Sequence, residues 1–315
     1  MSMDNPLVTV LIVTWNRKDD VLEAVRSVYA QSYRPVEVLV VDNGSTDGTL
    51  DALAQTYPQA RSIALGENAG ASAGRNAGIA AARGDIIFLL DSDASLGPDT
   101  LTSAVSKLQS EPAVGVIACK IVNAATKQLD RHAGWAFSEK DRADQDRPWR
   151  AYRFSEGGAA VRREVFERAG DFWDRLFFGR EGEELSLRIW DAGYGILYWP
   201  EAIVYHRVSP LQSFSRPEKE YYDLRNSLYI GLARYPWWML LAFLPLRLGA
   251  SLVRGVRRRY LRYTVKALLD VLRHAPALLR ERRPVKSSTA RLYITLHREH
   301  GSLRWDLKSW LKYKA

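Results

Sequence analysis

Three apolar runs in the first hundred residues limit the possible folds more than any other feature of this chain. The runs cover residues 8–14, 36–41 and 86–90 and consist mostly of β-branched and large aliphatic side chains. Runs that are apolar almost throughout are typical of parallel strands buried on both faces of a sheet. Segments with apolar residues at helical spacing separate them, such as residues 21–31. This alternation predicts an α/β fold with a mostly parallel sheet flanked by helices.

Each of the three runs is followed by polar residues. These are Thr14-Trp15-Asn16, Asp42-Asn43-Gly44 and Asp91-Ser92-Asp93. Ligands of open α/β sheets bind at the carboxyl ends of the strands, so this edge is expected to bind a polar ligand. Residues i and i+2 of an extended segment point the same way, so Asp91 and Asp93 could share one divalent cation. The structural alternative is a turn that caps the next helix.

A loop rich in glycine, alanine and asparagine, residues 66–76, adds a second ligand-binding signal. Glycines allow close backbone approach, and Arg75 can pair with phosphate at a helix start. The G-x-G-x-x-G turn of dinucleotide-binding folds is absent after the first run, because no glycine lies between Thr9 and Gln31. The Walker A pattern is absent as well.

Four motifs in order resemble those of family 2 glycosyltransferases, which are inverting enzymes with the GT-A fold. They are residues 10–17, 40–49, 67–78 and the DxD motif at 89–94, and the resemblance covers roughly residues 7–235. Within this family the chain resembles bacterial rhamnosyl- and galactosyl-type enzymes that act on lipid-linked glycans. The resemblance implies a nucleoside-diphosphate sugar as donor and Mn²⁺ or Mg²⁺ as cofactor.

The resemblance also assigns roles to individual residues. Asp42 would hydrogen-bond the nucleobase with Thr14 beside it, and Arg75 would lie near the base or the phosphates. The full donor-binding set is Thr14, Asn16, Asp42, Asn68, Arg75, Asp91 and Gly158. The metal ligands would be Asp91, Asp93 and His206, although a lone histidine is more often structural.

Residues 172–188 resemble the segment that carries the catalytic base, with one departure. Aligned on residues 185–188, the acidic pair of the family becomes Glu181-Gly182. The base is therefore expected to be Glu181 or Glu183, with Glu181 favoured and Glu184 in support. If a carboxylate takes the proton of the acceptor hydroxyl, we expect one direct displacement with inversion at the anomeric carbon. The alternative is that these glutamates only favour the positive end of a helix.

The carboxyl-terminal part differs in charge from the rest. Residues 247–315 contain 18 Lys and Arg against 4 Asp and Glu. The apolar stretch before it contains Trp237 and Trp238, and Pro245 and Arg247 interrupt it before the ~20 residues that a bilayer-spanning helix needs. We therefore predict interfacial helices on an anionic membrane surface. The alternative is a helical subdomain that covers the core or forms a homo-oligomer.

The sequence thus predicts two parts. Residues 1–235 form the GT-A domain, with a nucleotide-binding half at about 1–120 and an acceptor half at about 121–235, and residues 236–315 form the basic helical region. Arg225 is expected to help place the acceptor. The expected protein is peripheral at the cytoplasmic membrane face, because no signal peptide pattern opens the sequence. Nucleic acid is not an expected partner, since no recognition motif accompanies the basic residues.

The expected activity is transfer of a sugar to a hydroxyl of a lipid-linked, polyprenyl-type glycan. One alternative is an enzyme that glycosylates polyprenyl phosphate, an ionised acceptor that needs no base. The other is a catalytically silent GT-A scaffold that binds membrane or partners.

Overall fold

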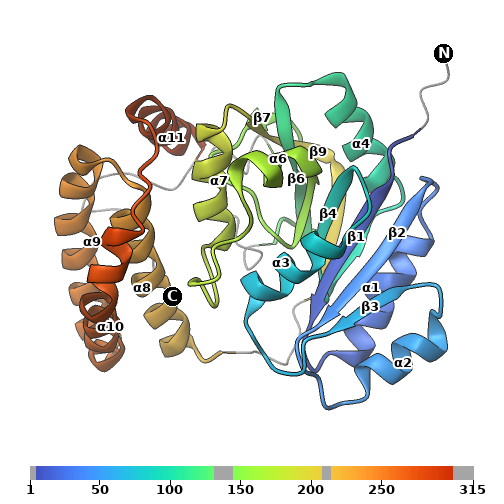
Figure 1. The fold of residues 1–315 in the computed structure, drawn as a ribbon, viewed down its shortest axis with the longest axis horizontal. Helices are drawn as coiled ribbons and strands as arrows, with labels where there is room; N and C mark the ends of the chain where they lie inside the picture. Colours follow the sequence, from blue (N-terminus) through green and yellow to red (C-terminus); the bar gives the residue numbers. More distant parts are fainter. Residues whose placement is uncertain (1–4, 131–144, 208–213, 301–315) are drawn as a thin grey trace. The chain divides into compact units, whose positions relative to one another are not determined.

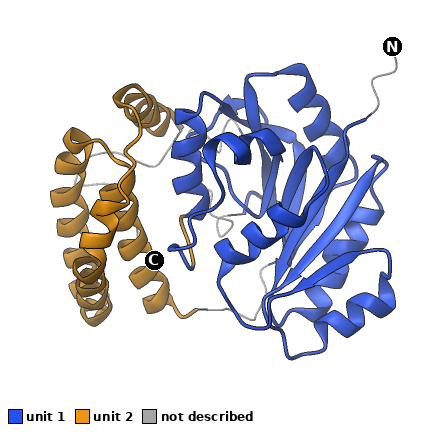
Figure 2. Cartoon of the chain, viewed as in Figure 1, with its two compact units in different colours: residues 1–177, 181–209 blue, residues 178–180, 210–315 orange. Residues whose placement is uncertain are grey.

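A computed structural model of the chain describes residues 5–130, 145–207 and 214–300. The chain divides into two compact units. Unit 1 comprises residues 1–177 and 181–209, and unit 2 comprises residues 178–180 and 210–315 (Figure 2).

Unit 1 is built on one nine-stranded sheet with the order β3-β2-β1-β4-β8-β6-β9-β5, and β7 pairs with β9. Strands β1, β2, β3 and β4 are mutually parallel, β6 is parallel to β9, and β8 runs antiparallel between β4 and β6. The mostly parallel sheet predicted from the apolar runs is therefore confirmed (Figure 1). The strands are β1 (Val8–Thr14), β2 (Val36–Asp42), β3 (Arg61–Ala64), β4 (Ile86–Asp91), β5 (Ala94–Leu96), β6 (Val114–Asn123), β7 (Trp149–Arg150), β8 (Gly158–Arg162) and β9 (Gly195–His206).

Helices of unit 1 flank this sheet (Figure 1). They are α1 (Lys18–Tyr29), α2 (Thr49–Thr56), α3 (Ala71–Ala81), α4 (Thr100–Ser110), α6 (Arg163–Ala169) and α7 (Glu181–Asp191). Helix α3 lies very close to β1, because a Cβ atom on Gly74 or Gly78 would lie 2.7 Å from Val13 or 2.2 Å from Leu11. The small residues of α3 thus hold the loop before it against the end of β1.

The segment after Asp91 does not form a helix cap. Ser92 and Asp93 form a turn, and the short strand β5 follows before α4 begins at Thr100. Strand β5 pairs antiparallel with β9, which places Ala94 opposite His206. This pairing was not expected from the sequence, and it brings the DxD motif to the end of β9.

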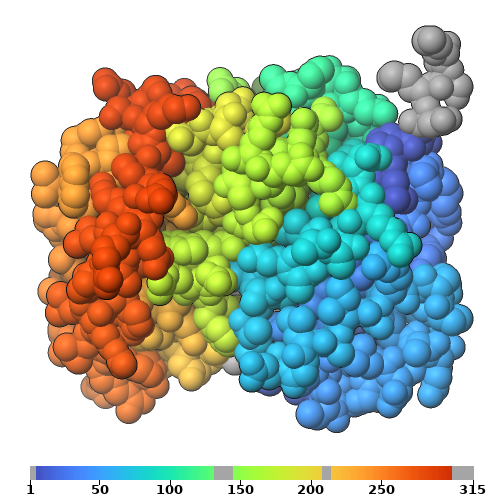
Figure 3. Space-filling model, viewed as in Figure 1, coloured from blue at the N-terminus to red at the C-terminus, as the bar shows by residue number. Residues whose placement is uncertain are grey.

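The described part of unit 2 contains the helices α8 (Arg216–Arg234), α9 (Trp237–Arg257), α10 (Leu261–Arg280) and α11 (Ser287–His300). Helix α8 begins with a capping box between Ser215 and Glu218 and packs against α9 and α10. In the space-filling view these helices form the orange-to-red part of the surface (Figure 3).

Helix α9 runs without a break through Pro245 and Arg247, the two residues that interrupt the apolar stretch in the sequence. By length and composition alone, α9 could cross a membrane, which by itself is weak evidence for a span. Its central Arg247 is only 2% exposed. The guanidinium lies 2.6 Å from the Asp223 carboxylate and donates to Ser227 Oγ at 2.7 Å, both on α8. The charge of Arg247 is therefore neutralised inside unit 2.

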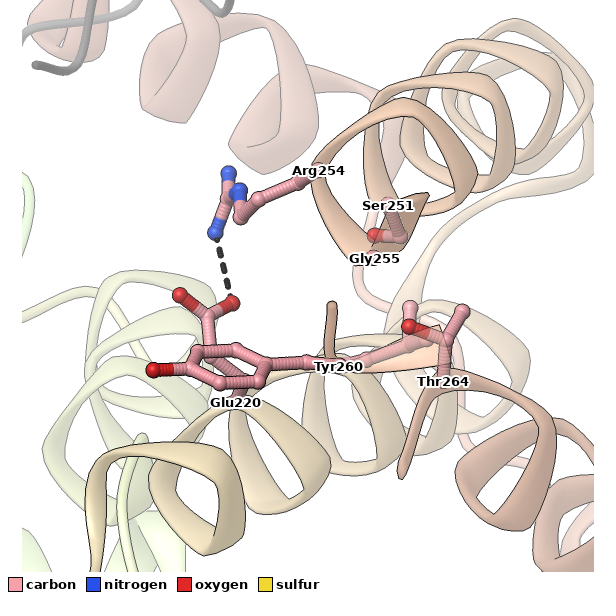
Figure 4. Close-up of a pocket in the computed structure, with 7 residues that line it drawn as sticks. Glu220, Ser251, Arg254, Gly255, Tyr260 and Thr264 are labelled. Carbon is pink, nitrogen blue, oxygen red and sulfur yellow. Dashed lines mark hydrogen bonds and ion pairs between the residues drawn. The ribbon is translucent and has the colours of Figure 1, made fainter. Parts of the chain in front are cut away.

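Unit 2 also contains a small pocket, shown in Figure 4. Glu220 lies at this pocket and forms ion pairs of 3.0 Å with both Arg254 and Arg258. None of the residues expected to bind the donor lines it. The lining residues are Glu220, Leu224, Ser251, Arg254, Gly255, Tyr260 and Thr264.

Candidate functional site

The polar ends of three strands meet at one edge of the sheet. In the β1–β2 register Thr14 lies opposite Asp42, and in the β1–β4 register Val13 lies opposite Asp91. The three polar segments singled out in the sequence therefore lie side by side. The residues expected to bind the nucleotide come together because the parallel strands end in register.

Three buried polar atoms at this edge have no hydrogen-bond partner among the described residues. They are Thr14 Oγ1, Asp42 Oδ1 and Asn43 Oδ1. The other carboxylate oxygen of Asp42 accepts a hydrogen bond from the Ser45 amide at 2.9 Å. An unsatisfied buried polar atom costs about 1–3 kcal/mol, so a ligand that supplies hydrogen bonds here would gain affinity.

Asn16 and Asn68 connect the loops around these atoms. Asn16 adopts a left-handed conformation (φ 51°), its amide donates to Ser45 Oγ at 2.8 Å, and its Oδ1 accepts from the Thr46 amide at 2.8 Å. Asn68 Oδ1 accepts from the Gly70 amide at 3.0 Å. Both side chains thus shape the loops at the strand ends.

Arg75 of α3 lies beside Asp91, with 3.3 Å between Nη2 and Oδ1. Burial alone would lower the pKa of Arg75, but the carboxylates of Glu156, Asp91 and Glu181 raise it. Desolvation raises the pKa of Asp91, Arg75 opposes that rise, and the like charge of Asp93 adds to it. The positive charge of Arg75 therefore offsets part of the negative charge of the surrounding carboxylates.

Of the two adjacent glycines before and in β8, Gly157 is the one that contacts Asp91. A Cβ atom on Gly157 would lie 2.4 Å from Asp91 Oδ2, whereas one on Gly158 would lie 3.0 Å from Val204. Gly158, the residue expected to bind the donor, thus faces β9. Gly157 was not singled out, although it belongs to the same glycine pair.

Asp93 and His206 form the candidate metal site. The distance between Asp93 Oδ1 and His206 Nε2 is 3.5 Å. Two ligands that each bind one cation at about 2.1 Å lie at most about 4.2 Å apart, so these atoms fit a shared ion. The other oxygen of Asp93 lies 2.9 Å from Arg17 Nη1. Within the described residues, no group of three His, Cys, Asp or Glu side chains is arranged to hold a metal ion.

Asp130 supports His206 from the other side of the imidazole ring. His206 Nδ1 lies 2.6 Å from Asp130 Oδ2, and Asp130 is buried. Burial alone would lower the pKa of His206, but hydrogen bonds with Asp93 and Asp130 raise it to about 9. A carboxylate on the far ring nitrogen is the usual support of a metal-binding histidine. Sequence analysis missed Asp130, because an isolated aspartate 76 positions from His206 gives no local signal.

The three glutamates at the start of α7 are all buried. Glu181, Glu183 and Glu184 are 4%, 9% and 0% exposed. Glu184 forms an ion pair of 2.6 Å with Arg188, and that guanidinium also donates to the Asp171 carbonyl at 2.6 Å. Glu183 lies 3.7 Å from Arg153 Nη1. Arg188, which Glu184 holds in place, therefore ties α7 to the segment that follows α6.

Glu156 is a fourth carboxylate at the start of α7, and sequence analysis missed it. Its Oε1 accepts a hydrogen bond from the Gly182 amide. A Cβ atom on Gly182 would lie 2.7 Å from that oxygen. Two features of the sequence could have indicated it. Gly182 stands where the family resemblance expects an acid, and Glu156 directly precedes the Gly157-Gly158 pair.

Arg225 belongs to unit 2, on α8. Its guanidinium lies over the rings of Tyr221, Tyr222 and Tyr229 and donates to Asn226 Oδ1 at 2.9 Å. Asn226 in turn donates to the carbonyls of Phe178 and Gly179 at 2.9 and 2.7 Å. The Arg-Asn pair thus holds the short segment of unit 2 that precedes Glu181 in the sequence.

The sequence is similar to those of known proteins. Residues 9–170, about half of the chain, match the family described as Glycosyl transferase family 2. The chain is 42% identical over 103 residues to the succinoglycan biosynthesis protein ExoO of Rhizobium meliloti, a match that covers 32% of this chain and 30% of that protein. It is 27% identical over 299 residues to the N-acetylglucosaminyl-diphospho-decaprenol L-rhamnosyltransferase of Mycobacterium tuberculosis, which covers 80% of this chain and 96% of that protein.

A solved structure shares the fold. The mannosyltransferase PcManGT from Pyrobaculum calidifontis, determined in complex with GDP-Man and Mn²⁺, superposes with a TM-score of 0.57 at 22% identity, covering 98% of this chain and 87% of that one. The chain therefore belongs to glycosyl transferase family 2 and is a glycosyltransferase with the GT-A fold.

Proposed function

We propose that this chain is an inverting, metal-dependent glycosyltransferase that moves a sugar from a nucleoside-diphosphate sugar to a hydroxyl of a lipid-linked glycan. The observation that carries the proposal is the set of unpaired buried atoms on Thr14, Asp42 and Asn43, next to the carboxylates of the DxD motif. Two of these atoms are acceptor oxygens of Asp42 and Asn43, so they require a ligand with N–H or O–H donors. A nucleobase and its ribose supply such donors.

The charged residues of the site suit the diphosphate half of such a donor. Asp93 and His206, with Asp91 nearby, would hold Mn²⁺ or Mg²⁺, and the bound ion would neutralise the charge that develops on the leaving diphosphate. Arg75 would pair with phosphate oxygens from the other side of Asp91. PcManGT was determined with a nucleotide sugar and Mn²⁺, which supports this assignment by analogy of fold.

The acceptor is proposed from two independent features. The rhamnosyltransferase relative is named for an N-acetylglucosaminyl-diphospho-decaprenol acceptor, and the match covers 96% of its length. Helices α9 and α10 of unit 2 carry most of the exposed large apolar side chains of the described residues, from Trp237 to Leu279. Exposed basic residues such as Arg262 and Lys266 lie among them.

This mixture is typical of helices that rest on an anionic membrane surface. We therefore propose that the protein is attached peripherally to the cytoplasmic face of the membrane. A lipid-linked acceptor would be presented there.

One observation favours a second candidate function. Gly182 occupies the position at which the family resemblance expects the base, and an enzyme that glycosylates polyprenyl phosphate needs none, because its acceptor is already ionised. In that case Glu156 and the glutamates at the start of α7 would all be dispensable for turnover. Their replacement by glutamine would leave the rate within a few fold of wild type.

The experiment that tests the proposed function is a thermal-shift panel of UDP-, dTDP- and GDP-sugars, each with and without Mn²⁺ or Mg²⁺. A ligand that binds only the folded state raises its apparent stability. We expect a metal-dependent shift with one nucleotide class, and we expect Asp93→Ala to abolish it. If no nucleotide shifts the transition with either metal, the chain is better explained as a silent GT-A scaffold.

A further inference from the structure

At the start of α7, a carboxylate from another segment fills the space that a side chain at position 182 would occupy, which the sequence does not reveal. Gly182 has no side chain, and the volume that one would occupy is filled by the Glu156 carboxylate from the turn before β8. A Cβ atom on Gly182 would lie 2.7 Å from Glu156 Oε1 and 2.8 Å from both Glu156 Cδ and the Phe154 carbonyl oxygen. An acidic side chain at position 182 and Glu156 therefore cannot both occupy this space.

Within the part of the chain that the structure describes, the Glu156 carboxylate is held at one oxygen only. Oε1 accepts a hydrogen bond from the Gly182 amide in the first turn of α7, an 11-residue helix. No other donor within the described residues reaches this carboxylate. Its Oε2 is therefore left to interact with a substrate, while the anchored oxygen fixes its orientation.

The neighbouring glutamates are less suited to meet a substrate. Glu184 is fully buried and paired with Arg188, and Glu183 lies near Arg153. Glu181 is 4% exposed, whereas Glu156 is partly exposed. A group that takes a proton from an incoming hydroxyl has to reach that hydroxyl directly or through one water.

Glu156 also lies beside the proposed donor site. The next residue, Gly157, contacts the Asp91 carboxylate so closely that a Cβ atom there would lie 2.4 Å from Oδ2. Both carboxylates act on the charge of Arg75. Two of the buried atoms without a partner among the described residues lie nearby: Thr14 ends β1, the strand that pairs with β4, and Asp42 ends β2, which pairs with β1.

We propose that Glu156, and not a residue of α7, is the general base, a role that rests on the hydroxyl acceptor of the proposed function. The acceptor O–H proton moves to Glu156 Oε2 as the oxygen forms its bond to the anomeric carbon. The bond between that carbon and the diphosphate oxygen breaks, and its electron pair leaves with the nucleoside diphosphate. The proton is then released to solvent.

Glu156→Gln tests the role, because glutamine keeps the size of the side chain and an oxygen that accepts from the Gly182 amide. The readout is nucleoside diphosphate release from the nucleotide sugar that stabilises the wild type, with water and a short-chain N-acetylglucosaminyl-diphosphate lipid offered as acceptors. We expect kcat to fall by ~10²–10⁴-fold. The donor-induced thermal shift and the donor KM should stay unchanged.

The matched control is Glu181→Gln, for which we expect a much smaller loss of kcat.

Three outcomes would overturn the inference. In the first, Glu156→Gln retains wild-type kcat while Glu181→Gln loses it, which makes Glu181 the base. In the second, Glu156→Gln loses the donor-induced shift together with kcat, which makes Glu156 a binding residue. In the third, wild type binds and turns over no nucleotide sugar, a failure of the proposed function that is visible before any variant is made.

Discussion

Asp130 Oδ2 lies 2.6 Å from His206 Nδ1, on the opposite side of the imidazole from the Asp93 carboxylate. The buried aspartate thus fixes the ring so that Nε2 points toward Asp93. Outer partners of metal-binding histidines typically change metal affinity by about 10–100-fold when they are removed. We therefore expect Asp130→Asn to weaken Mn²⁺ binding by that factor, measured as the Mn²⁺ concentration that gives half of the nucleotide-dependent thermal shift.

The control for this prediction is Asp99→Asn, an exposed aspartate whose side chain makes no cap hydrogen bond at the start of α4. It should leave the Mn²⁺ dependence unchanged. Equal Mn²⁺ affinity in Asp130→Asn and wild type would show that His206 is not a metal ligand.

Thr14 offers a test that separates binding from stability. Its buried Oγ1 has no partner among the described residues, so Thr14→Val removes an unsatisfied group and keeps the shape of the side chain. We expect the free protein to be at least as stable as wild type and nucleotide affinity to fall by about 2–10-fold, the value of one hydrogen bond. Thermal unfolding with and without the nucleotide measures both.

Thr9→Val is the matched control on the same strand. Thr9 Oγ1 donates to Glu37 at 2.5 Å and accepts from the Gly84 amide at 2.8 Å. This variant should lose stability without losing nucleotide affinity. A Thr14→Val variant that is destabilised to the same degree would mean that Thr14 Oγ1 is paired in the folded protein.

Gly157→Ala should disturb the site without unfolding the sheet. The added methyl group would lie 2.4 Å from Asp91 Oδ2, so the carboxylate has to move. A displacement of about 1 Å can cost about 10²-fold in rate, and we expect a loss of at least tenfold in kcat. Gly195→Ala is the control, because its new methyl group would lie 3.4 Å from its nearest neighbour. If Gly157→Ala retains full activity, Asp91 does not contact the donor or the ion.

The fold could be predicted from the sequence because its information is local. The runs at residues 8–14 and 86–90 are apolar throughout, and burial on both faces of a parallel sheet is the simplest structure that accommodates them. The polar residues that follow these runs have to lie close together, because parallel strands in register end at the same edge of the sheet. The DxD motif and the nucleotide-binding candidates were therefore placed correctly relative to the sheet.

The remaining parts of the site depend on contacts between distant segments. The three-residue strand β5 forms only because β9 pairs with it, and that pairing brings Asp93 to His206. The contact of Glu156 with Gly182 joins a turn and a helix 26 positions apart. Neither contact leaves a periodic pattern in the sequence, so sequence reasoning considered only the carboxylates of α7 for this part of the site.

The ion pair between Asp223 and Arg247 predicts how acid affects unit 2. Burial alone would raise the pKa of Asp223, but Arg180 and Arg247 lower it well below its ordinary range. A carboxylate with a lowered pKa stabilises the folded state above about pH 4, the range of an unfolded aspartate, and this contribution is lost as the pH falls through the lower folded-state value. The difference in stability between wild type and Asp223→Asn should therefore narrow below about pH 4.

At pH 7 we expect Asp223→Asn to lose less stability than the about 3–5 kcal/mol of a fully buried pair, because Arg247 is buried and would keep its charge, whereas the Asp223 side chain is 35% exposed and partly screened by solvent. Thermal unfolding of both proteins from pH 7 to pH 3 measures the effect. Glu23→Gln is the control, since its partner Arg26 is 68% exposed and a surface pair contributes less than about 1 kcal/mol. A difference that does not change with pH would contradict the assignment.

The exposed apolar side chains of α10 predict how the protein attaches to membranes. Leu269 and Leu272 are 62% and 69% exposed and are three positions apart, so they lie on the same face of the helix. Transfer of one leucine from water to an apolar environment gains about 1.5–3 kcal/mol. We expect Leu269→Gln combined with Leu272→Gln to lower binding to phosphatidylglycerol vesicles by at least about tenfold, measured by co-sedimentation.

Further measurements distinguish membrane binding by this face of α10 from self-association of the chain. Basic residues such as Arg262 and Lys266 are exposed on the same helix, so wild-type binding should weaken in 0.5 M salt and on phosphatidylcholine vesicles. Sedimentation velocity without lipid then reports self-association. If the double variant binds vesicles as wild type does but no longer self-associates, the exposed face of α10 is an interface between two copies of the chain, and the membrane has to be reached by another surface.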